Sequence, residues 1–392
     1  MTLKKRLLLC FIGCWALGYS QQVTLSPAAK ISLITCGSGE ELYATFGHSA
    51  FRVFDPILEI DVVYNYGTFD FNTPHFYLKF TQGKLLYSLS RQPFAHFIYE
   101  YEVENRWVKE QLLQLDASQT AHFFTFLETN YRPENRDYKY DFLFDNCATK
   151  MGEVLVRTFG DALRYDYTHL KEQYTFRELI HQNLKTNSWS AFGIDLALGS
   201  VIDRTATPQE HLFLPNYVMR QMQHATLGAK PLVLQERTIL EEKGQETRPS
   251  FWLSPLFWLS LLLGLVLGIT YRDYRKNTQS RWLDFILFFT TGLAGFVILF
   301  LWFLSEHTTT VSNFNVLWAF PLNIIVAFFL FSKRAKGSVL GLYMMVLCGL
   351  LLLALLLWVL KIQVFSPLLL LLLTALGLRY VFLHFHFKKA GH

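Results

Sequence analysis

The stretch 138-YKYDFLFDNCATKMGEVLVRTF-159 changes character near its middle. Up to Phe144 it is rich in aromatic residues and predicts an extended segment. From Cys147 onward, apolar side chains recur every four residues and predict a helix that starts at the cysteine; they are Met151, Leu155 and Phe159. The unpaired N–H groups and the positive end of the dipole at a helix start stabilise a thiolate. The stretch therefore predicts an activated thiol where an extended segment gives way to a helix.

A histidine on an earlier strand is suited to accept the proton of this thiol. The stretch 45-TFGHSAFRVF-54 predicts a strand, and it carries His48. The long separation from the cysteine does not matter, because catalytic groups meet in space rather than in sequence. An imidazole beside a thiol acts as general base and acid when a third polar group fixes its tautomer. Asn65 on the next strand-like run is the expected third group, with Tyr64 and Asp70 as rivals.

The surrounding sequence predicts a mixed α+β domain. Strands are expected at 61–66 and 85–89, and helices at 104–115, 118–131 and 174–184. The segment ahead of residue 250 is long enough for one well-buried domain. We expect a helix packed on an antiparallel sheet.

The N-terminus has the pattern of a secretory signal peptide. Basic residues at 4–6 precede an apolar run at 7–17, and small residues stand at positions 18 and 20. The apolar run is shorter than the roughly 20 residues that a membrane-spanning helix needs. We therefore expect a signal peptide at 1–20, an exported catalytic domain at 21–230 and a linker at 231–250.

After residue 250 the chain becomes strongly apolar and predicts an all-α membrane domain at 251–392. Five runs qualify as transmembrane helices: about 252–271, 282–304, 314–331, 338–360 and 364–383. Lys and Arg gather in the first and third connectors and in the tail, whereas the second connector has none and the fourth has only Lys361. The positive-inside rule then places the N-terminal domain outside and the C-terminus in the cytoplasm.

The net charge of +5 reflects membrane orientation rather than nucleic-acid binding. The basic excess lies in the signal region and the membrane connectors, while residues 21–250 are acidic overall. A nucleic-acid-binding domain needs a basic patch on its folded surface. His75, His96 and His122 show no spacing typical of metal ligands. We expect no nucleic acid, no metal and no cofactor.

Several short motifs, in this order, resemble a known family. A strand histidine followed by Asn-Cys at a helix start is similar to the circularly permuted NlpC-type papain-like fold, to which lecithin–retinol acyltransferase belongs. More closely, the chain resembles bacterial lipoprotein N-acyltransferases of the Lnb type. The motifs that carry this resemblance are 35-TCGSGEELY-43, 46-FGH-48, 63-VYNYGTF-69, 140-YDF-142, 146-NC-147, 213-FLP-215, 305-SEH-307 and 313-NFNVLW-318.

The resemblance implies a specific reaction. Cys147 would be the nucleophile and His48 the general base and acid. An acyl chain would pass from a membrane phospholipid, through a cysteine thioester, to the α-amine of a diacylglyceryl-cysteine lipoprotein. The partners implied are the phospholipid donor, the lipoprotein acceptor and the membrane. The implied location is the bacterial inner membrane, with several spans and the catalytic domain in the periplasm.

The loop between the second and third apolar runs is a second place of interest. Glu306 and His307 stand at a membrane edge, and Asn313 and Asn315 follow within a few residues. Polar residues at such an edge are commonly just solvated. The alternative is a surface that binds the acceptor or docks the exported domain, and these four residues are the candidates for it.

Two other functions fit the same residues. The thiol mechanism also serves hydrolysis, either of cell-wall peptides or of lipids, in a membrane-tethered papain-like enzyme. Alternatively, Cys36 and Cys147 form a disulfide in a non-enzymatic membrane scaffold, since exported cysteine pairs often do. The number of apolar runs exceeds what an anchor requires, which favours a lipid substrate.

Overall fold

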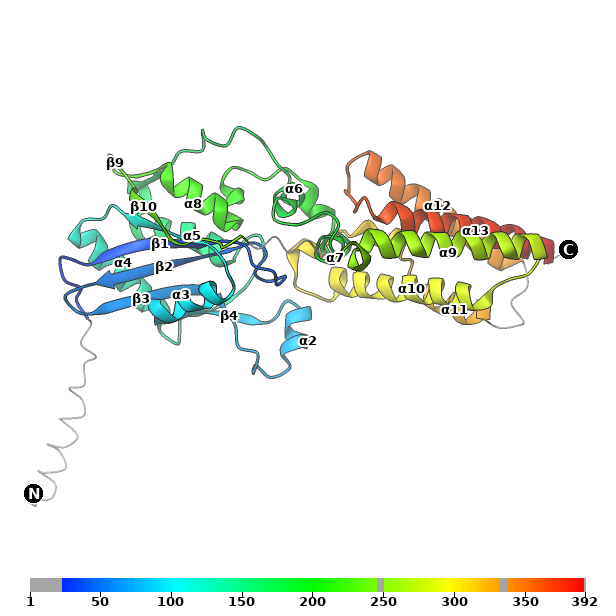
Figure 1. Ribbon diagram of the computed structural model, residues 1–392, viewed down its shortest axis with the longest axis horizontal. Helices are drawn as coiled ribbons and strands as arrows, with labels where there is room; N and C mark the ends of the chain where they lie inside the picture. Colours follow the sequence, from blue (N-terminus) through cyan, green and yellow to red (C-terminus); the bar gives the residue numbers. More distant parts are fainter. Residues whose placement is uncertain (1–22, 245–249, 332–337, 391–392) are drawn as a thin grey trace, which may run out of the picture.

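The protein consists of a sheet-containing domain followed by an elongated helical bundle (Figure 1). The computed structural model describes residues 23–244, 250–331 and 338–390. The predicted signal peptide, 1–20, lies outside the described residues. The two parts meet end to end, and the C-terminus lies at the end of the bundle far from the sheet.

A seven-stranded antiparallel sheet forms the centre of the N-terminal domain, in the order β10-β5-β1-β2-β3-β4-β6. Its strands are β1 (Lys30–Cys36), β2 (His48–Asp55), β3 (Ile60–Thr68), β4 (Leu86–Pro93), β5 (Val108–Leu113), β6 (Asp137–Lys139) and β10 (Val233–Leu240). A second sheet joins β7 (Leu163–Tyr165), β8 (Ala225–Leu227) and β9 (Lys230–Pro231). Cys36 at the end of β1 lies opposite His48 at the start of β2. Strand β2 also pairs with β3, so the predicted strands around His48 and Asn65 are confirmed as neighbours.

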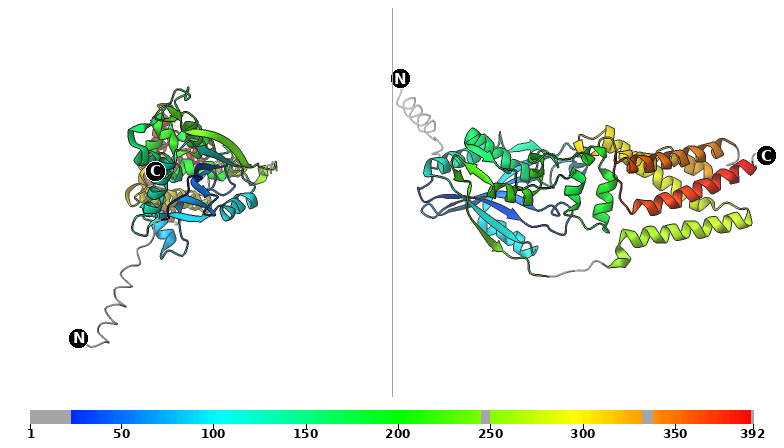
Figure 2. Two further views of the ribbon diagram at one scale, coloured as in Figure 1. Left: turned by 90° about the vertical axis from the view of Figure 1, so that its left-hand side faces the viewer. Right: turned by 90° about the horizontal axis from the view of Figure 1, so that it is seen from above.

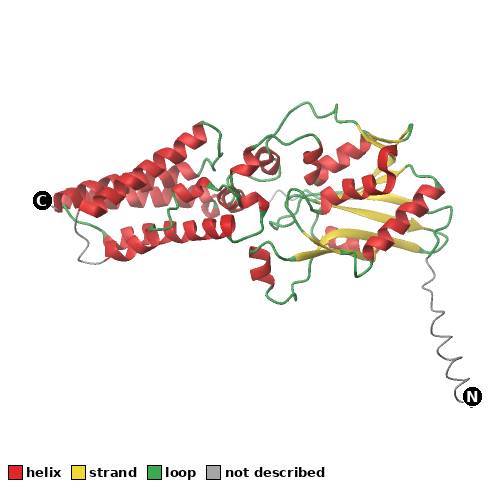
Figure 3. Cartoon of the chain, turned by 180° about the vertical axis from the view of Figure 1, so that it is seen from behind, coloured by secondary structure: helices red, strands yellow, loops and turns green. Residues whose placement is uncertain are grey.

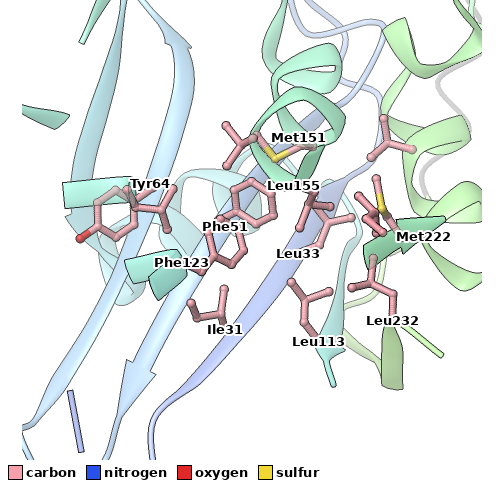
Figure 4. Close-up of a cluster of buried hydrophobic side chains, with 14 of the residues drawn as sticks. Ile31, Leu33, Phe51, Tyr64, Leu113, Phe123, Met151, Leu155, Met222 and Leu232 are labelled. Carbon is pink, nitrogen blue, oxygen red and sulfur yellow. The ribbon is translucent and has the colours of Figure 1, made fainter. Parts of the chain in front are cut away.

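Helices cover both faces of the large sheet (Figure 3). One face carries α4 (Ala117–Tyr131), α5 (Cys147–Phe159) and α8 (Pro215–Gln223), and the other carries α3 (Phe94–Val103). Alternate residues of β2 supply the two cores, with Phe51 and Val53 on the first face and Ala50 on the second. Figure 4 shows the first core, in which Met151 and Leu155 of α5 pack above Phe51. The expected helix on an antiparallel sheet is confirmed.

Two predicted elements of this domain are wrong. Residues 104–115 were expected to be helical, but 108–113 form β5 between β1 and β10. Hydrogen bonding to β1 and β10 outweighs the helical spacing of the apolar residues. The buried carboxylate of Glu110 adds ion pairs with Arg52 at 3.0 Å and with Arg237 at 2.6 Å. Residues 231–250 were expected to be a linker, yet 233–240 form the edge strand β10.

Among the described residues of the membrane domain, four helices are long and apolar enough to cross a bilayer: α9 (Pro255–Lys276), α10 (Arg281–Phe303), α12 (Ser338–Val359) and α13 (Leu369–Ala390). The two views of Figure 2 show them bundled along one axis. The third expected span, 314–331, is not one long helix. It consists of a 3₁₀ turn, Phe314–Leu317, a break at Pro321, and the short α11 (Asn323–Phe331). Proline lacks the N–H that a continuous helix needs at that position.

The interrupted segment nevertheless runs along the whole of α10. At one end Phe314 lies 6.2 Å from Trp302, and at the other Phe331 lies 4.5 Å from Trp282, measured between ring centroids. Gly292 and Gly295 of α10 permit the close approach, because a Cβ on Gly295 would stand 1.9 Å from the carbonyl oxygen of Ala319. Trp282 and Trp302 are separated by about 30 Å along a helix, which is the thickness of a bilayer core.

The helical annex before the bundle joins the two parts. It contains α6 (Phe176–His181) and α7 (Trp189–Ala197). The N–H of Gly199 donates to the carbonyl of Thr309, and the N–H of Ser200 donates to that of Ser312. Arg177, almost fully buried beneath this contact, binds Asp203 at 2.7 Å and Asp195 at 2.9 Å. The junction is therefore built from backbone pairing over a buried ion cluster.

Replacing Arg177 should weaken the junction strongly. Arg177→Ala leaves Asp203 buried without its cation and Asp195 with only His181, which costs about 3–5 kcal/mol. The matched control is Arg204→Ala, which removes a half-exposed pair with Glu210 worth about 1 kcal/mol or less. Thermal unfolding of the detergent-solubilised full chain measures both. Equal, small shifts in the two variants would contradict the assigned role of Arg177.

Candidate active site

Cys147 occupies the first turn of α5, where Asn146 caps the helix. The side-chain oxygen of Asn146 accepts from the N–H groups of Ala148 and Thr149, at 2.8 and 2.9 Å. Its amide nitrogen donates to the carbonyls of Phe142 and Phe213. The predicted helix start at the cysteine is confirmed, and the cap fixes its direction.

His48 lies against Cys147 and is held by Asn65. The Nε2 atom of His48 is 2.6 Å from the side-chain oxygen of Asn65. Because that oxygen only accepts, the proton resides on Nε2, and Nδ1 remains free to take a proton from the thiol. A hydrogen bond links the side chains of His48 and Cys147. The structure thus brings the three residues expected from the sequence into one group.

The rival third residues lie elsewhere. The hydroxyl of Tyr64 donates to the carboxylate of Glu128. The carboxylate of Asp70 accepts from the backbone and side-chain nitrogens of Asn72, at 2.8 and 2.9 Å. Of the three candidates, Asn65 is the one whose side chain contacts the His48 ring.

The charges of the pair stabilise each other. Burial alone raises the pKa of the Cys147 thiol, but the His48 imidazolium, its hydrogen bond, and the N–H groups of Ser49 and Ala148 outweigh burial and lower that pKa. Burial likewise lowers the pKa of His48, but the Cys147 thiolate and the hydrogen bonds to Cys147 and Asn65 raise it overall. The arrangement therefore favours a thiolate–imidazolium pair.

The backbone of Gly67 lies close beside Cys147, and sequence reasoning did not find this contact. Gly67 has φ near +89°, a backbone conformation that favours glycine. A Cβ placed on Gly67 would stand 3.4 Å from the Cβ of Cys147 and 3.9 Å from both its backbone nitrogen and the hydroxyl of Tyr138. That hydroxyl is buried and has no hydrogen-bond partner among the described residues. The backbone nitrogen of Cys147 and the Tyr138 hydroxyl thus lie around one point beside Gly67 and the nucleophile. The glycine within the strand pattern was the available signal, since it marks close backbone approach.

Cys36 does not form the disulfide considered from the sequence. Cys36 and Cys147 are both free thiols. Cys36 is fully buried, and burial raises its pKa despite a hydrogen bond with Tyr101. It is therefore an inert core thiol on the strand next to His48. Within the described residues, no three His, Cys, Asp or Glu side chains gather in a way that could hold a metal ion.

The four membrane-loop candidates contact the N-terminal domain. Glu306 pairs with Lys139, and a ring nitrogen of His307 donates to the carbonyl of Phe80 at 2.9 Å. These two side chains remain partly exposed, and substrate contact stays a prediction for them. The neighbouring Thr308 donates to Asp141 at 2.6 Å, just ahead of the Cys147 helix.

Asn313 and Asn315 are fully buried at the junction. Asn313 donates to the carbonyls of Leu196 and Ala197, and Asn315 donates to that of Asp195. The oxygen of Asn315 accepts from the indole of Trp318. Their polar groups are used within the protein, so of the two roles considered for them, docking fits these contacts and direct substrate binding does not.

Comparison with protein families agrees with this architecture. Residues 19–182 match the model of the Lnb N-terminal periplasmic domain, and residues 246–390 match that of the Lnb transmembrane domain. The chain is an Lnb-type protein. No curated protein and no solved structure matches it. The two families imply a multi-pass membrane protein with an enzymatic role in lipoprotein maturation.

The charge pair predicts an unusual pH dependence for alkylation of this Lnb-type protein. Because His48 lowers the pKa of Cys147, iodoacetamide should react with Cys147 at pH values well below those an ordinary thiol requires. His48→Ala leaves only burial and backbone contacts, so the midpoint should move upward. Asn65→Ala should move it upward by less, since Asn65 acts through His48.

The measurement is the rate at which Cys147 is alkylated at each pH, monitored by peptide mass spectrometry in a Cys36→Ala background. An unchanged midpoint in His48→Ala would show that the imidazole does not activate the thiol.

Proposed function

We propose that this protein is a lipoprotein N-acyltransferase that uses Cys147 as a covalent acyl carrier. The observation that carries the proposal is the group of Cys147, His48 and Asn65, in a domain docked on a membrane bundle. The two Lnb family matches support the lipoprotein acceptor. Both substrates are confined to a membrane, so a docked catalytic domain raises their effective concentration.

In the first half-reaction the Cys147 thiolate attacks an ester carbonyl of a phospholipid. The ester C–O bond breaks, and the His48 imidazolium gives its proton to the departing lysophospholipid oxygen. A thioester remains on Cys147. In the second half-reaction the α-amine of a diacylglyceryl-cysteine attacks that thioester, His48 accepts the amine proton, and the C–S bond breaks. The products are an amide and the restored thiolate.

The point beside Gly67 is suited to the negative oxygen formed in both steps. The backbone N–H of Cys147 and the hydroxyl of Tyr138 border it. Donors already aimed at a developing charge stabilise the transition state without reorganisation. The unpartnered state of the Tyr138 hydroxyl is explained if its acceptor is that oxygen.

The same proposal covers the finer features of architecture. A histidine on β2 and a cysteine at the start of α5 follow the order of the permuted NlpC-type fold. Residues 314–331 would form the fifth crossing, because they extend along the full apolar length of α10. Five crossings place the C-terminus in the cytoplasm, opposite a periplasmic domain, in the bacterial inner membrane.

The direct test is the mass of the protein after incubation with phospholipid and without acceptor. We expect a hydroxylamine-sensitive gain of one acyl chain on Cys147, abolished in Cys147→Ala and reduced about 10²- to 10⁴-fold in His48→Ala. Cys36→Ala is the matched control and should acylate normally. Turnover by purified Cys147→Ala would falsify the mechanism, and a thioester that only water discharges would indicate a hydrolase instead.

Tyr138→Phe tests the oxyanion assignment. Removing one donor should lower the rate of thioester formation about 10²- to 10³-fold. The alkylation rate of Cys147 should change little, because the thiolate is stabilised by other groups. Tyr165→Phe is the control, since it also removes a buried hydroxyl without a hydrogen-bond partner, in the second sheet. Equal effects of the two variants would rule out a specific role for Tyr138.

A further inference from the structure

Residues 69–80 present an exposed aromatic surface, here called the aromatic shelf. It comprises Phe69, Phe71, Phe76, Tyr77 and Phe80. Helix α2 (Phe76–Thr81) within it buries none of its residues. Tyr77 is 78% exposed and Phe71 is 66% exposed. A contiguous exposed aromatic cluster in water is unfavourable and marks an interaction site.

The shelf lies at the level where the bundle begins. The N–H of Glu306 donates to the carbonyl of Gln82, and the ring of His307 donates to that of Phe80. Both donors directly follow α10, whose last residue is Phe303. Figure 1 shows α2 beside this end of α10 and apart from the main sheet. The shelf is thus held at the outer end of a membrane-spanning helix.

The position of the shelf at the outer end of α10 indicates that lipid covers its aromatic side chains. Tyr concentrates where acyl chains meet lipid headgroups, because its ring is apolar and its hydroxyl is polar, and Phe is common on the apolar face of segments that lie at this boundary. Phe303 and Leu304 at the end of α10 are exposed in the same way and extend the apolar surface into the bundle. Lys79 in the last turn of α2 and Lys84 just after the helix suit the phosphates of the headgroup layer. The shelf therefore fits the outer surface of the bilayer that the bundle crosses.

A row of aromatic rings leads from the shelf toward the thiol. The ring of Phe69 lies 5.3 Å from Tyr87, and Tyr87 stacks on Tyr140 at 4.3 Å. Phe69 follows two residues after Gly67, which borders Cys147. Burial and the neighbouring Cys147 thiolate raise the pKa of the Tyr140 hydroxyl, so the row of rings ends near the nucleophile.

We propose that the aromatic shelf sits in the outer leaflet at the boundary of headgroups and acyl chains, and that the row Phe69–Tyr87–Tyr140 guides the acyl chain of the phospholipid donor to Cys147. The second half of this proposal rests on the proposed acyl transfer. The first half concerns only the membrane and stands without it.

The depth of the shelf is measured with the full chain in liposomes. A spin label is attached at Tyr77→Cys, in a background in which the native cysteines are replaced. The matched control is Ile57→Cys, because Ile57 is exposed and apolar but lies in the β2–β3 turn. We expect the label at 77 to be accessible to oxygen in lipid and the label at 57 to a water-soluble nickel chelate. Water exposure of both labels would overturn the membrane position.

The donor route is tested with two donors. The double variant Phe71→Ser/Tyr77→Ser should form the Cys147 thioester from phospholipid vesicles at least about tenfold more slowly. Both substitutions remove aromatic surface that the bilayer would otherwise bury. Its acylation by p-nitrophenyl acetate, a small water-soluble ester, should stay within about twofold of the unchanged protein, because the thiol is intact. The control Ile57→Ser/Leu58→Ser should match the unchanged protein with both donors.

The outcomes separate the two proposals. Equal loss with both donors, or no loss with either, would overturn the route along the shelf. Failure of the unchanged protein to form a thioester from either donor would overturn the acyl transfer, while the spin-label result would still decide the membrane position.

Discussion

The site depends most on the effect that Cys147 and His48 have on each other, since each shifts the pKa of the other towards the charged form. Either group alone would be neutral in the interior, because burial raises the pKa of the thiol and lowers the pKa of the imidazole. Together they compensate that cost, provided that the two side chains cannot move apart. Much of the domain serves this condition: β2 carries His48, β3 carries Asn65, and the cap of α5 fixes Cys147.

The second requirement is a fixed relation between this pair and the bilayer. The loop after α10 contacts α2 through His307, the segment ahead of the nucleophile through Thr308, and the annex through its backbone. Such a junction is unlike a flexible tether, since its polar groups pair with one another over the buried Arg177. The proposed reaction between a phospholipid and a lipoprotein would benefit from this rigidity, because neither substrate can leave the membrane to reach the thiol.

In both parts of the molecule, glycine allows another segment to approach the backbone closely. Gly67 leaves room beside Cys147, whereas Gly292 and Gly295 let an interrupted chain pack directly on α10. Irregular backbone at membrane depth is tolerated where neighbouring protein covers it. The buried amides of Asn313 and Asn315 meet the same need at the start of that segment.

The sequence by itself determined the candidate residues Cys147, His48 and Asn65 and the order of the main elements. The helix at 147–159, the strand with His48 and the four long apolar helices follow from local periodicity, capping and hydrophobic length, which act over neighbouring residues. Tertiary structure alone decided the rest. Residues 108–113 and 233–240 became strands because sheet partners distant in sequence were available. Tyr138 reached the thiol through β4–β6 pairing, and Asn315 became a docking residue through burial against Asp195. Contacts between distant segments are fixed only when the whole chain has folded, and no local pattern encodes them.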